Sequence, residues 1–304
     1  MPALDITHAR PSTSLADSQY GYVPHEYVAV LFIALFGLST ILHIGQAAHY
    51  RMWWLFPTVC LCGIGEIIGW SGRLWSSFSP SLHTPFMIQV ISTVISPTPL
   101  IAVNFVLLAW IITKLGPAYA RLAPTTYTII FVCSDILALL VQAAGGSIAA
   151  GAHDLHGAQV GAHIMLGGIV FQFTALITYC YLAADFLIRF ANDRPVYLPR
   201  TSGRPLLDMR TKRMIFALSF STLVLFIRSI YRIVELGSGW HGRIMHTEVY
   251  FNVLDGAMVL LAMLTFNFDH PGALLGPHKP EAPAEYGAKL EDVSTQMGTE
   301  TVDF

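Results

Sequence analysis

Residues 214–236, MIFALSFSTLVLFIRSIYRIVEL, decide the fold class of this chain. A helix of about 20 predominantly apolar residues crosses the hydrocarbon core of a bilayer, and this stretch is that long. Arg228, Arg232 and Glu235 follow at steps of four and three, so they share one helical face. An unpaired charge at a bilayer centre costs about 2.5–3.5 kcal/mol, so this face must meet other polar groups or water. The stretch therefore predicts a membrane helix whose charged face points into a helix bundle.

Composition places the rest of the chain in the same class. Of its 304 residues, 54% are hydrophobic and only 12% are charged, whereas soluble domains carry about 25% charged residues. Hydropathy predicts seven spans of sufficient length. They cover residues 27–48, 53–75, 86–113, 126–148, 159–190, 214–236 and 244–268. We therefore expect an all-α, polytopic membrane protein built as a seven-transmembrane-helix bundle.

Three regions are expected along the chain. Residues 1–25 are polar and lack the basic start, apolar run and cleavage site of a signal peptide, so they form an outer N-terminal segment. Residues 26–270 form the membrane domain. Residues 271–304 hold few large apolar side chains, and a disordered cytoplasmic tail is expected there.

The orientation follows from the basic residues of the connections. With the N-terminus outside, the inner side receives twelve Lys and Arg residues and the outer side keeps two, Arg10 and Arg243. The connection between spans five and six dominates this difference. Because cytoplasmic loops carry the excess of Lys and Arg, we expect an outward N-terminus and a cytoplasmic C-terminus.

Polar residues of several spans fall at helical spacing and at depths in the middle and outer half of the membrane. We expect them to converge on a polar cavity that is open or gated toward the outer leaflet, and we take them as candidate substrate-binding residues. They are Glu66, Arg73, Asp135, Gln142, Gln172, Arg228, Arg232, Glu235, Glu248, Asn252 and Asp255.

The same charges have a plainer interpretation, in which buried pairs lock helices together. Arg232 with Glu235 or Glu248 is the pair that this interpretation predicts. The carboxylates outnumber the arginines, however, and this surplus favours the handling of protons or cations over packing alone.

Cofactors, metals and nucleic acids are not expected. Histidines near the outer connections could gather a zinc ion, but their spacing is not diagnostic. They are His153, His156, His163, His241 and His246, with Asp154 beside them. No Gly-rich nucleotide-binding loop is present, and a net charge of −2 leaves no basic patch for nucleic acid beyond what membrane topology explains.

A set of motifs recurs in order from Tyr20 to Gly272. They are Tyr20-Gly-Tyr-Val-Pro24, Glu66-Ile-Ile-Gly-Trp-Ser-Gly-Arg73, Asp135 with Gln142-Ala-Ala-Gly-Gly146, Gln172, Arg228 to Arg232 with Glu235, Glu248 with Tyr250 and Asp255, and His270-Pro-Gly272. Together they resemble the fungal lipid-translocating exporter family of aminocholesterol-resistance and sphingoid long-chain-base exporter type. The chain departs from that family at Asn104 and Phe105, where Ala and Tyr are expected.

This resemblance implies seven helices, an outward N-terminus, and movement of, or resistance to, amphipathic lipids. We therefore expect a flippase-like exporter that moves a sphingoid base, a sterol-like molecule or a related amphiphile toward the outer leaflet. Its partners are membrane lipids and the amphiphile, and the plasma membrane is favoured over an endomembrane. A cationic head would meet Glu66, Asp135, Glu248 and Asp255, with the arginines holding the carboxylates in place.

Two other classes of function stay open at this point. One is a membrane-embedded cyclase or hydrolase of a fungal secondary-metabolite pathway, with Glu66 or Asp135 as general acid. The other is a seven-helix receptor or sensor. Transport is favoured over catalysis, and the oligomeric state is left undetermined by the sequence.

Overall fold

The computed structural model describes residues 20–152, 154–197, 207–238 and 243–276. Within these residues all regular structure is helical. Seven segments are long and apolar enough to cross a membrane, which confirms the predicted seven-helix class. They are Glu26–His49, Trp53–Phe78, His83–Leu115, Pro124–Gly151, Leu155–Ala191, Met209–Gly237 and Glu248–Leu275. The chain is an integral, multi-pass membrane protein.

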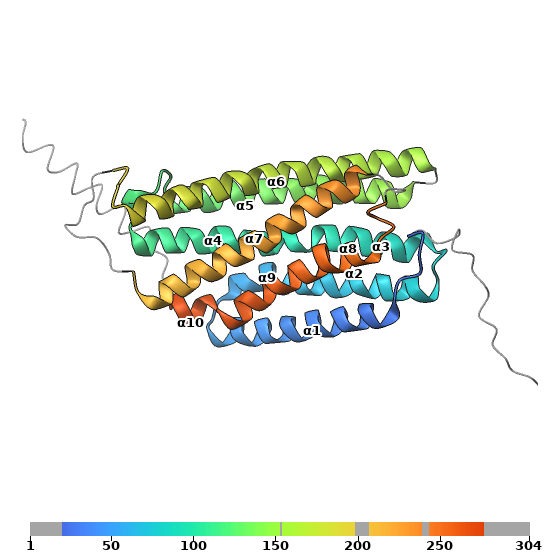
Figure 1. The fold of residues 1–304 in the computed structure, drawn as a ribbon, viewed down its shortest axis with the longest axis horizontal. Coiled ribbons are helices and arrows are strands. Elements are labelled where there is room, and N and C mark those ends of the chain that lie inside the picture. The colour runs from blue at the N-terminus through green and yellow to red at the C-terminus, as the bar shows by residue number, and fades with distance from the viewer. Residues whose placement is uncertain (1–19, 153, 198–206, 239–242, 277–304) are drawn as a thin grey trace, which may run out of the picture.

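Ten α-helices make up these segments (Figure 1). They are α1 (Glu26–His49), α2 (Leu61–Phe78), α3 (His83–Ile95), α4 (Pro97–Leu115), α5 (Pro124–Gly151), α6 (Leu155–Ala191), α7 (Met209–Gly237), α8 (Glu248–Phe251), α9 (Ala257–Phe268) and α10 (Pro271–Leu275). Two π-helical turns, Phe56–Cys60 and Asn252–Gly256, join α2 and α9 to what precedes them. The end of the bundle where α1 begins is called the N-terminal end, and the opposite end, where α6 ends and α7 begins, is called the basic end.

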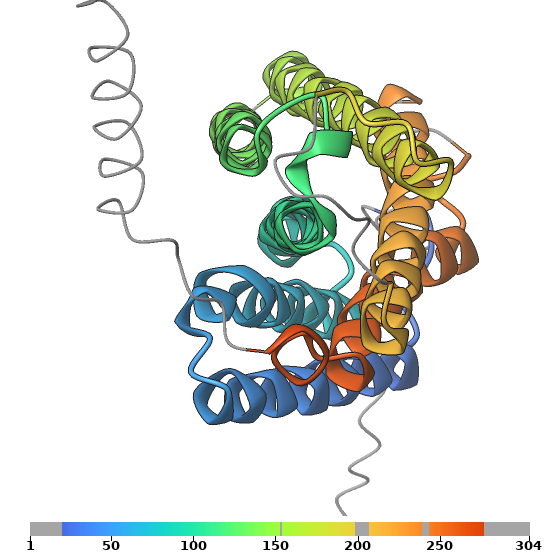
Figure 2. The ribbon, with the colours of Figure 1, turned by 90° about the vertical axis from the view of Figure 1, so that its left-hand side faces the viewer.

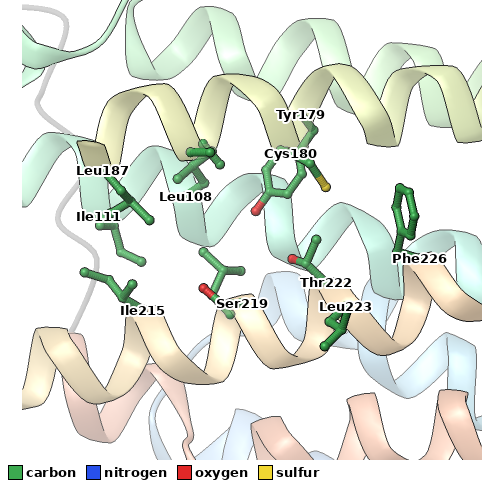
Figure 3. A pocket seen from close by; sticks show the side chains of 13 residues that line it. Leu108, Ile111, Tyr179, Cys180, Leu187, Ile215, Ser219, Thr222, Leu223 and Phe226 are labelled. Atoms are coloured by element: carbon green, nitrogen blue, oxygen red, sulfur yellow. The ribbon is translucent and has the colours of Figure 1, made fainter. Parts of the chain in front are cut away.

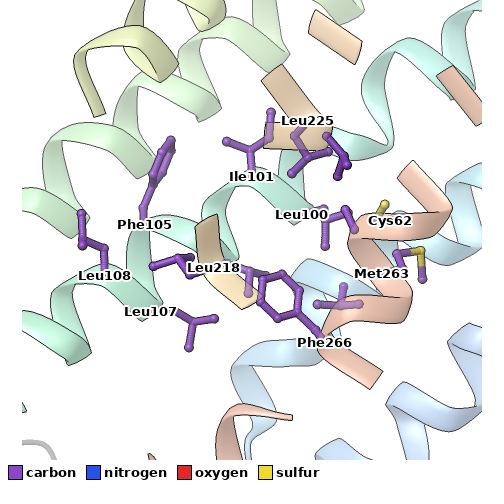
Figure 4. Packing of buried hydrophobic residues seen from close by; sticks show 14 of the residues in the cluster. Cys62, Leu100, Ile101, Phe105, Leu107, Leu108, Leu218, Leu225, Met263 and Phe266 are labelled. Carbon is purple, nitrogen blue, oxygen red and sulfur yellow. The ribbon is translucent and has the colours of Figure 1, made fainter. Parts of the chain in front are cut away.

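Helix α4 occupies the middle of the bundle, as the end-on view shows (Figure 2). It contacts α2, α5, α6 and α7, and its span is the most buried of the seven. The apolar core joins α4 to α7 and α9 through side chains such as Leu100, Leu225 and Phe266 (Figure 4). The outer helices therefore surround one central helix, and their polar faces meet beside it.

The third span, expected as one helix over residues 86–113, is divided between α3 and α4 at Pro97. Proline has no backbone N–H, so the carbonyl of Thr93, one turn earlier, loses its helical donor. In a membrane such a carbonyl needs another donor, because no water is at hand. The sequence Ser96-Pro97-Thr98-Pro99 carries this signal.

Helices α5 and α6 approach each other closely over small residues. A Cβ added at Gly145 would stand 2.6 Å from the backbone nitrogen of Met165, and one at Gly161 would collide with the backbone of Ala149. Glycine at both positions therefore lets the two backbones touch, as is common between membrane helices.

The last span differs from its expected bounds at both of its ends. Pro271 and Gly272 are buried, and α10 packs on α7, so part of the segment expected as tail is helical. The last span begins at Glu248 and not at 244, because Ile244–Thr247 forms a turn, closed by a hydrogen bond from the Thr247 nitrogen to the Ile244 oxygen. The rest of the expected tail and residues 1–19 of the expected outer segment lie outside the described residues.

Candidate functional site

Asp255 is the centre of a buried group of charged residues, here called the central cluster: Glu66, Arg228, Arg232, Glu235 and Asp255. Asp255 lies in the π-helical turn before α9, and its side chain is fully buried. Arg232 of α7 donates two hydrogen bonds to Asp255, from Nε to Oδ1 at 2.8 Å and from Nη2 to Oδ2 at 2.6 Å. Arg228, one turn earlier, donates from Nε to the same Oδ1 at 3.0 Å. π turns are frequent at functional sites, and this one brings Asp255 opposite both arginines.

Glu235 completes the network from the other side of Arg232. Its Oε2 accepts from Arg232 Nη1 at 2.6 Å, and its Oε1 accepts from the Tyr231 hydroxyl at 2.7 Å. The expected pairing of Arg232 with Glu235 is therefore present. Its alternative partner, Glu248, lies elsewhere, because Glu248 begins α8 near the N-terminal end whereas Arg232 lies at the depth of Asp255.

Arg228 also supplies hydrogen bonds to backbone carbonyls at the break in the third span. Its Nη2 donates to the carbonyl oxygens of Thr93, at 2.6 Å, and Val94, at 3.2 Å. The Thr93 carbonyl is the one that Pro97 leaves without a helical donor. Thr93 itself accepts from Arg232 Nη2 through its side-chain oxygen at 2.7 Å. The two arginines therefore hold α3, α7 and the π turn together, and the sequence analysis did not identify Thr93 as part of the site.

Glu66 differs from the other members of the central cluster. It is fully buried on α2, and neither carboxylate oxygen has a hydrogen bond among the described residues. It interacts electrostatically with Asp255, Arg228 and Arg232, and with the nearby Trp70 indole at a geometry looser than a hydrogen bond. Two arginines already balance Asp255 and Glu235, so Glu66 is the one carboxylate of the cluster without a cation of its own.

A second group, the outer pair of Arg73 and Glu248, lies at the N-terminal end. Arg73 is buried and donates to Glu248 at 3.1 Å and to the Tyr22 hydroxyl at 2.9 Å. Four aromatic rings surround its guanidinium at 4.7–5.8 Å from their centroids, those of Tyr20, Tyr22, Trp70 and Phe251. Such cation–π contacts are strongest where water is excluded.

The segment Tyr20–His25 covers the outer pair. The other Glu248 oxygen lies 2.5 Å from the His25 imidazole, which is 62% exposed. Burial raises the pKa of Tyr20 to about 12, and the Tyr20 hydroxyl donates to Ser76 at 3.2 Å. Neither Tyr22 nor His25 was among the candidate residues, although Tyr22 belongs to the Tyr20–Pro24 motif and His25 directly follows it.

Asp135, Gln142 and Gln172 form a third group, on α5 and α6. Gln142 Nε2 donates to Gln172 Oε1 at 2.9 Å. Asp135 is 3% exposed, and neither of its oxygens has a hydrogen bond in the described part of the chain. Among the described residues, Gln172 is the side chain that interacts electrostatically with the Asp135 carboxylate, and no arginine does so. The candidate residues therefore form three groups and not one cavity.

Two further expectations concern single residues and metals. Asn252 is half-buried, and its Oδ1 has no hydrogen bond in the described ranges, so it adds no contact to the central cluster. No group of three His, Cys, Asp or Glu able to hold a metal occurs among the described residues. His153 and His241, two members of the histidine set considered for zinc, lie outside those residues.

The arrangement pairs most of the buried charges and leaves two buried carboxylates, Glu66 and Asp135, without a hydrogen bond among the described residues. A family model described as RTA1 like protein matches residues 59–278. The chain is 29% identical over 280 residues to the sphingoid long-chain base transporter RSB1 of Saccharomyces cerevisiae, covering 83% of this chain and 73% of that protein.

Two other yeast proteins match over similar lengths. Protein RTA1 of Saccharomyces cerevisiae is 26% identical over 272 residues, covering 81% of this chain and 83% of the relative. Protoporphyrin uptake protein 1 of the same organism is 23% identical over 284 residues, covering 82% and 90%. No solved structure matches the chain. Because the family model covers well over half of the sequence, the chain belongs to the RTA1-like protein family.

Proposed function

We propose that this protein moves cationic, single-chain amphiphiles such as sphingoid bases across the membrane toward the outer leaflet. Family membership supports this proposal, as does similarity to a relative named as a sphingoid long-chain base transporter. A membrane protein with this role gives resistance to toxic amphiphiles by removing them from the inner leaflet. We place it in the plasma membrane with its N-terminus outside.

The observation that carries the proposal is the surplus carboxylate Glu66. Arg228 and Arg232 are matched in charge by Asp255 and Glu235, so an ionised Glu66 gives the central cluster one excess negative charge. A buried charge without a partner is costly, and it is lost when a proton or another cation arrives. An amine 4 Å away is attracted by about 4 kcal/mol at an effective dielectric constant of 20. Glu66 is therefore the proposed receptor for the amine.

The remaining groups take supporting roles in this proposal. The two arginines position Asp255 and Glu235, and Arg228 also holds the broken third span. Asp135 is proposed as a second binding site for the amine, because it is the other buried carboxylate that no arginine contacts among the described residues. The outer pair lies nearer the N-terminal end, where the amine would leave toward the outer leaflet.

The test is movement of a fluorescent long-chain base in liposomes that contain the purified protein. Wild-type protein should move it faster than protein-free liposomes do. Glu66→Gln should lower that rate at least tenfold, equivalent to about 1.4 kcal/mol, and should not lower thermal stability, because it keeps the shape and removes an unpaired charge.

Glu235→Gln is the matched control, since it makes the same change at a carboxylate that accepts from Arg232 and Tyr231. It should lower stability, because it strands part of the positive charge of Arg232. If wild-type protein moves the base no faster than protein-free liposomes, transport is rejected. Conversion of the base to a product without movement would favour a membrane-embedded enzyme.

A further inference from the structure

A cavity of about 390 Å³ lies between α4, α6 and α7 (Figure 3), and no member of the three groups of charged and polar candidates lines it. Its walls are mainly aliphatic and aromatic, with Leu108 on α4, Leu187 on α6 and Phe226 on α7. Leu187 lies near the end of α6, and Ile215 near the start of α7. The cavity therefore occupies the half of the bundle nearer the basic end, which we expect at the inner leaflet.

The opening of the cavity faces the surroundings of the helices. Ser219 and Leu223 of α7 both line it, both are exposed, and Leu223 has 54% of its surface accessible. Both residues lie within a membrane-spanning helix. The groups that approach them in a bilayer are hydrocarbon chains, and an apolar wall without atoms against it forfeits dispersion contacts. A hydrocarbon chain is therefore the natural occupant.

The volume selects one chain over two. About 30 Å³ is the share of one water molecule in the liquid, and a methylene group is of similar size, so the cavity holds roughly 13 such groups. One hydrocarbon chain of about that many carbons fills it. A phospholipid with two chains leaves one chain outside, so a single-chain molecule fits best.

Two residues that line the cavity, Ser219 and Thr222, do not bond the carbonyl one turn earlier in α7. Ser229 and Ser238 of α7 bond the carbonyl one turn earlier, which is how membrane helices usually satisfy such groups. Ser219 makes no hydrogen bond among the described residues, and Thr222 interacts with the Tyr179 hydroxyl instead of a carbonyl. Figure 3 shows Ser219 and Thr222 on the side of α7 that faces α6.

We propose that this cavity binds the hydrocarbon chain of a single-chain amphiphile, which enters between α6 and α7 from the leaflet at the basic end and bonds its first polar group to Ser219 and Thr222. The site goes beyond the proposed function and does not depend on it, because no residue of the central cluster lines the cavity.

Photo-crosslinking tests the site. A long-chain alcohol with a diazirine on its chain is added to the purified full-length protein in nanodiscs, and labelled residues are identified by mass spectrometry. The single-chain probe should label α6 and α7 at cavity residues such as Cys180 and Phe226. A two-chain phospholipid with the same diazirine should label lipid-facing residues such as Leu137 and Leu140, which are more than half exposed.

Filling the cavity should remove the label. Ser219→Phe should reduce cavity labelling at least tenfold, because the space for the chain and a hydrogen bond to its polar group are lost together. Ala184→Leu, an exposed position on the cavity wall, does the same with less risk to folding. Ser147→Phe is the matched control, because Ser147 is exposed on α5 and does not line the cavity.

The outcomes separate this site from the transport proposal. Glu66→Gln should keep cavity labelling whatever it does to transport. Equal labelling of the cavity by both probes, or full labelling of folded Ser219→Phe and Ala184→Leu proteins, would overturn the site and leave the role of Glu66 untouched.

Discussion

Replacing Arg232 by methionine should destabilise the folded protein by about 3–5 kcal/mol, the usual cost of removing one partner from a buried ion pair. The change removes four hydrogen bonds, two to Asp255, one to Glu235 and one to Thr93. Asp255 keeps Arg228 as its partner, so Glu235 becomes the stranded charge, with the Tyr231 hydroxyl as its remaining contact. For a domain of this size the loss corresponds to a fall in Tm of roughly 6–20 °C.

The assay is thermal unfolding of the purified protein in detergent, with folded yield from size-exclusion chromatography. Arg232→Met combined with Glu235→Gln restores the charge balance, so the double variant should regain at least half of the lost stability. Arg213→Met is the control, because the Arg213 side chain is 59% exposed in its ion pair with Asp269, and such a pair should contribute at most about 1 kcal/mol. An unchanged Tm for Arg232→Met, or a double variant less stable than the single one, would refute this account.

Two predictions address the ends of the molecule. In intact cells treated with an external protease, a tag at the C-terminus should be protected and a tag at the N-terminus should be cleaved. The reason is that most basic residues of the connections fall on the side of the membrane where the C-terminus is expected. The opposite pattern would reverse the proposed direction of transport. Gly21→Ala should speed hydrogen exchange of Tyr20–His25, because Gly21 has a φ of 71° and an added Cβ would meet the His246 ring, a conformation that costs alanine about 1–2 kcal/mol. Gly37→Ala is the control, because a Cβ added at Gly37 meets nothing within 4 Å, and it should leave hydrogen exchange of Tyr20–His25 unchanged. Equal exchange in the two variants would show that the backbone conformation at Gly21 does not hold this segment in place.

Several features of the fold were predictable from local sequence. The lengths of the apolar segments determine the number of spans, and the cost of charge in lipid requires that residues such as Arg228 and Arg232 face inward. Their spacing also predicted the pair of Arg232 with Glu235, because residues three apart on a helix are neighbours. Pro97 carried a signal for the break in the third span, which the segment assignment did not use.

Contacts between helices were not predictable in the same way. Helical periodicity determines which residues share a face, but pairing across helices depends on the rotation and axial offset of each helix. The π turn at Asn252–Gly256 changes both for Asp255, so that it meets Arg228 and Arg232, whereas Glu248 on the same span meets Arg73. Sequence alone therefore determined that charges lie inside a seven-helix bundle. The tertiary structure decided which are neutralised, leaving Glu66 and Asp135 without a cationic hydrogen-bond partner among the described residues and a chain-sized cavity beside α7.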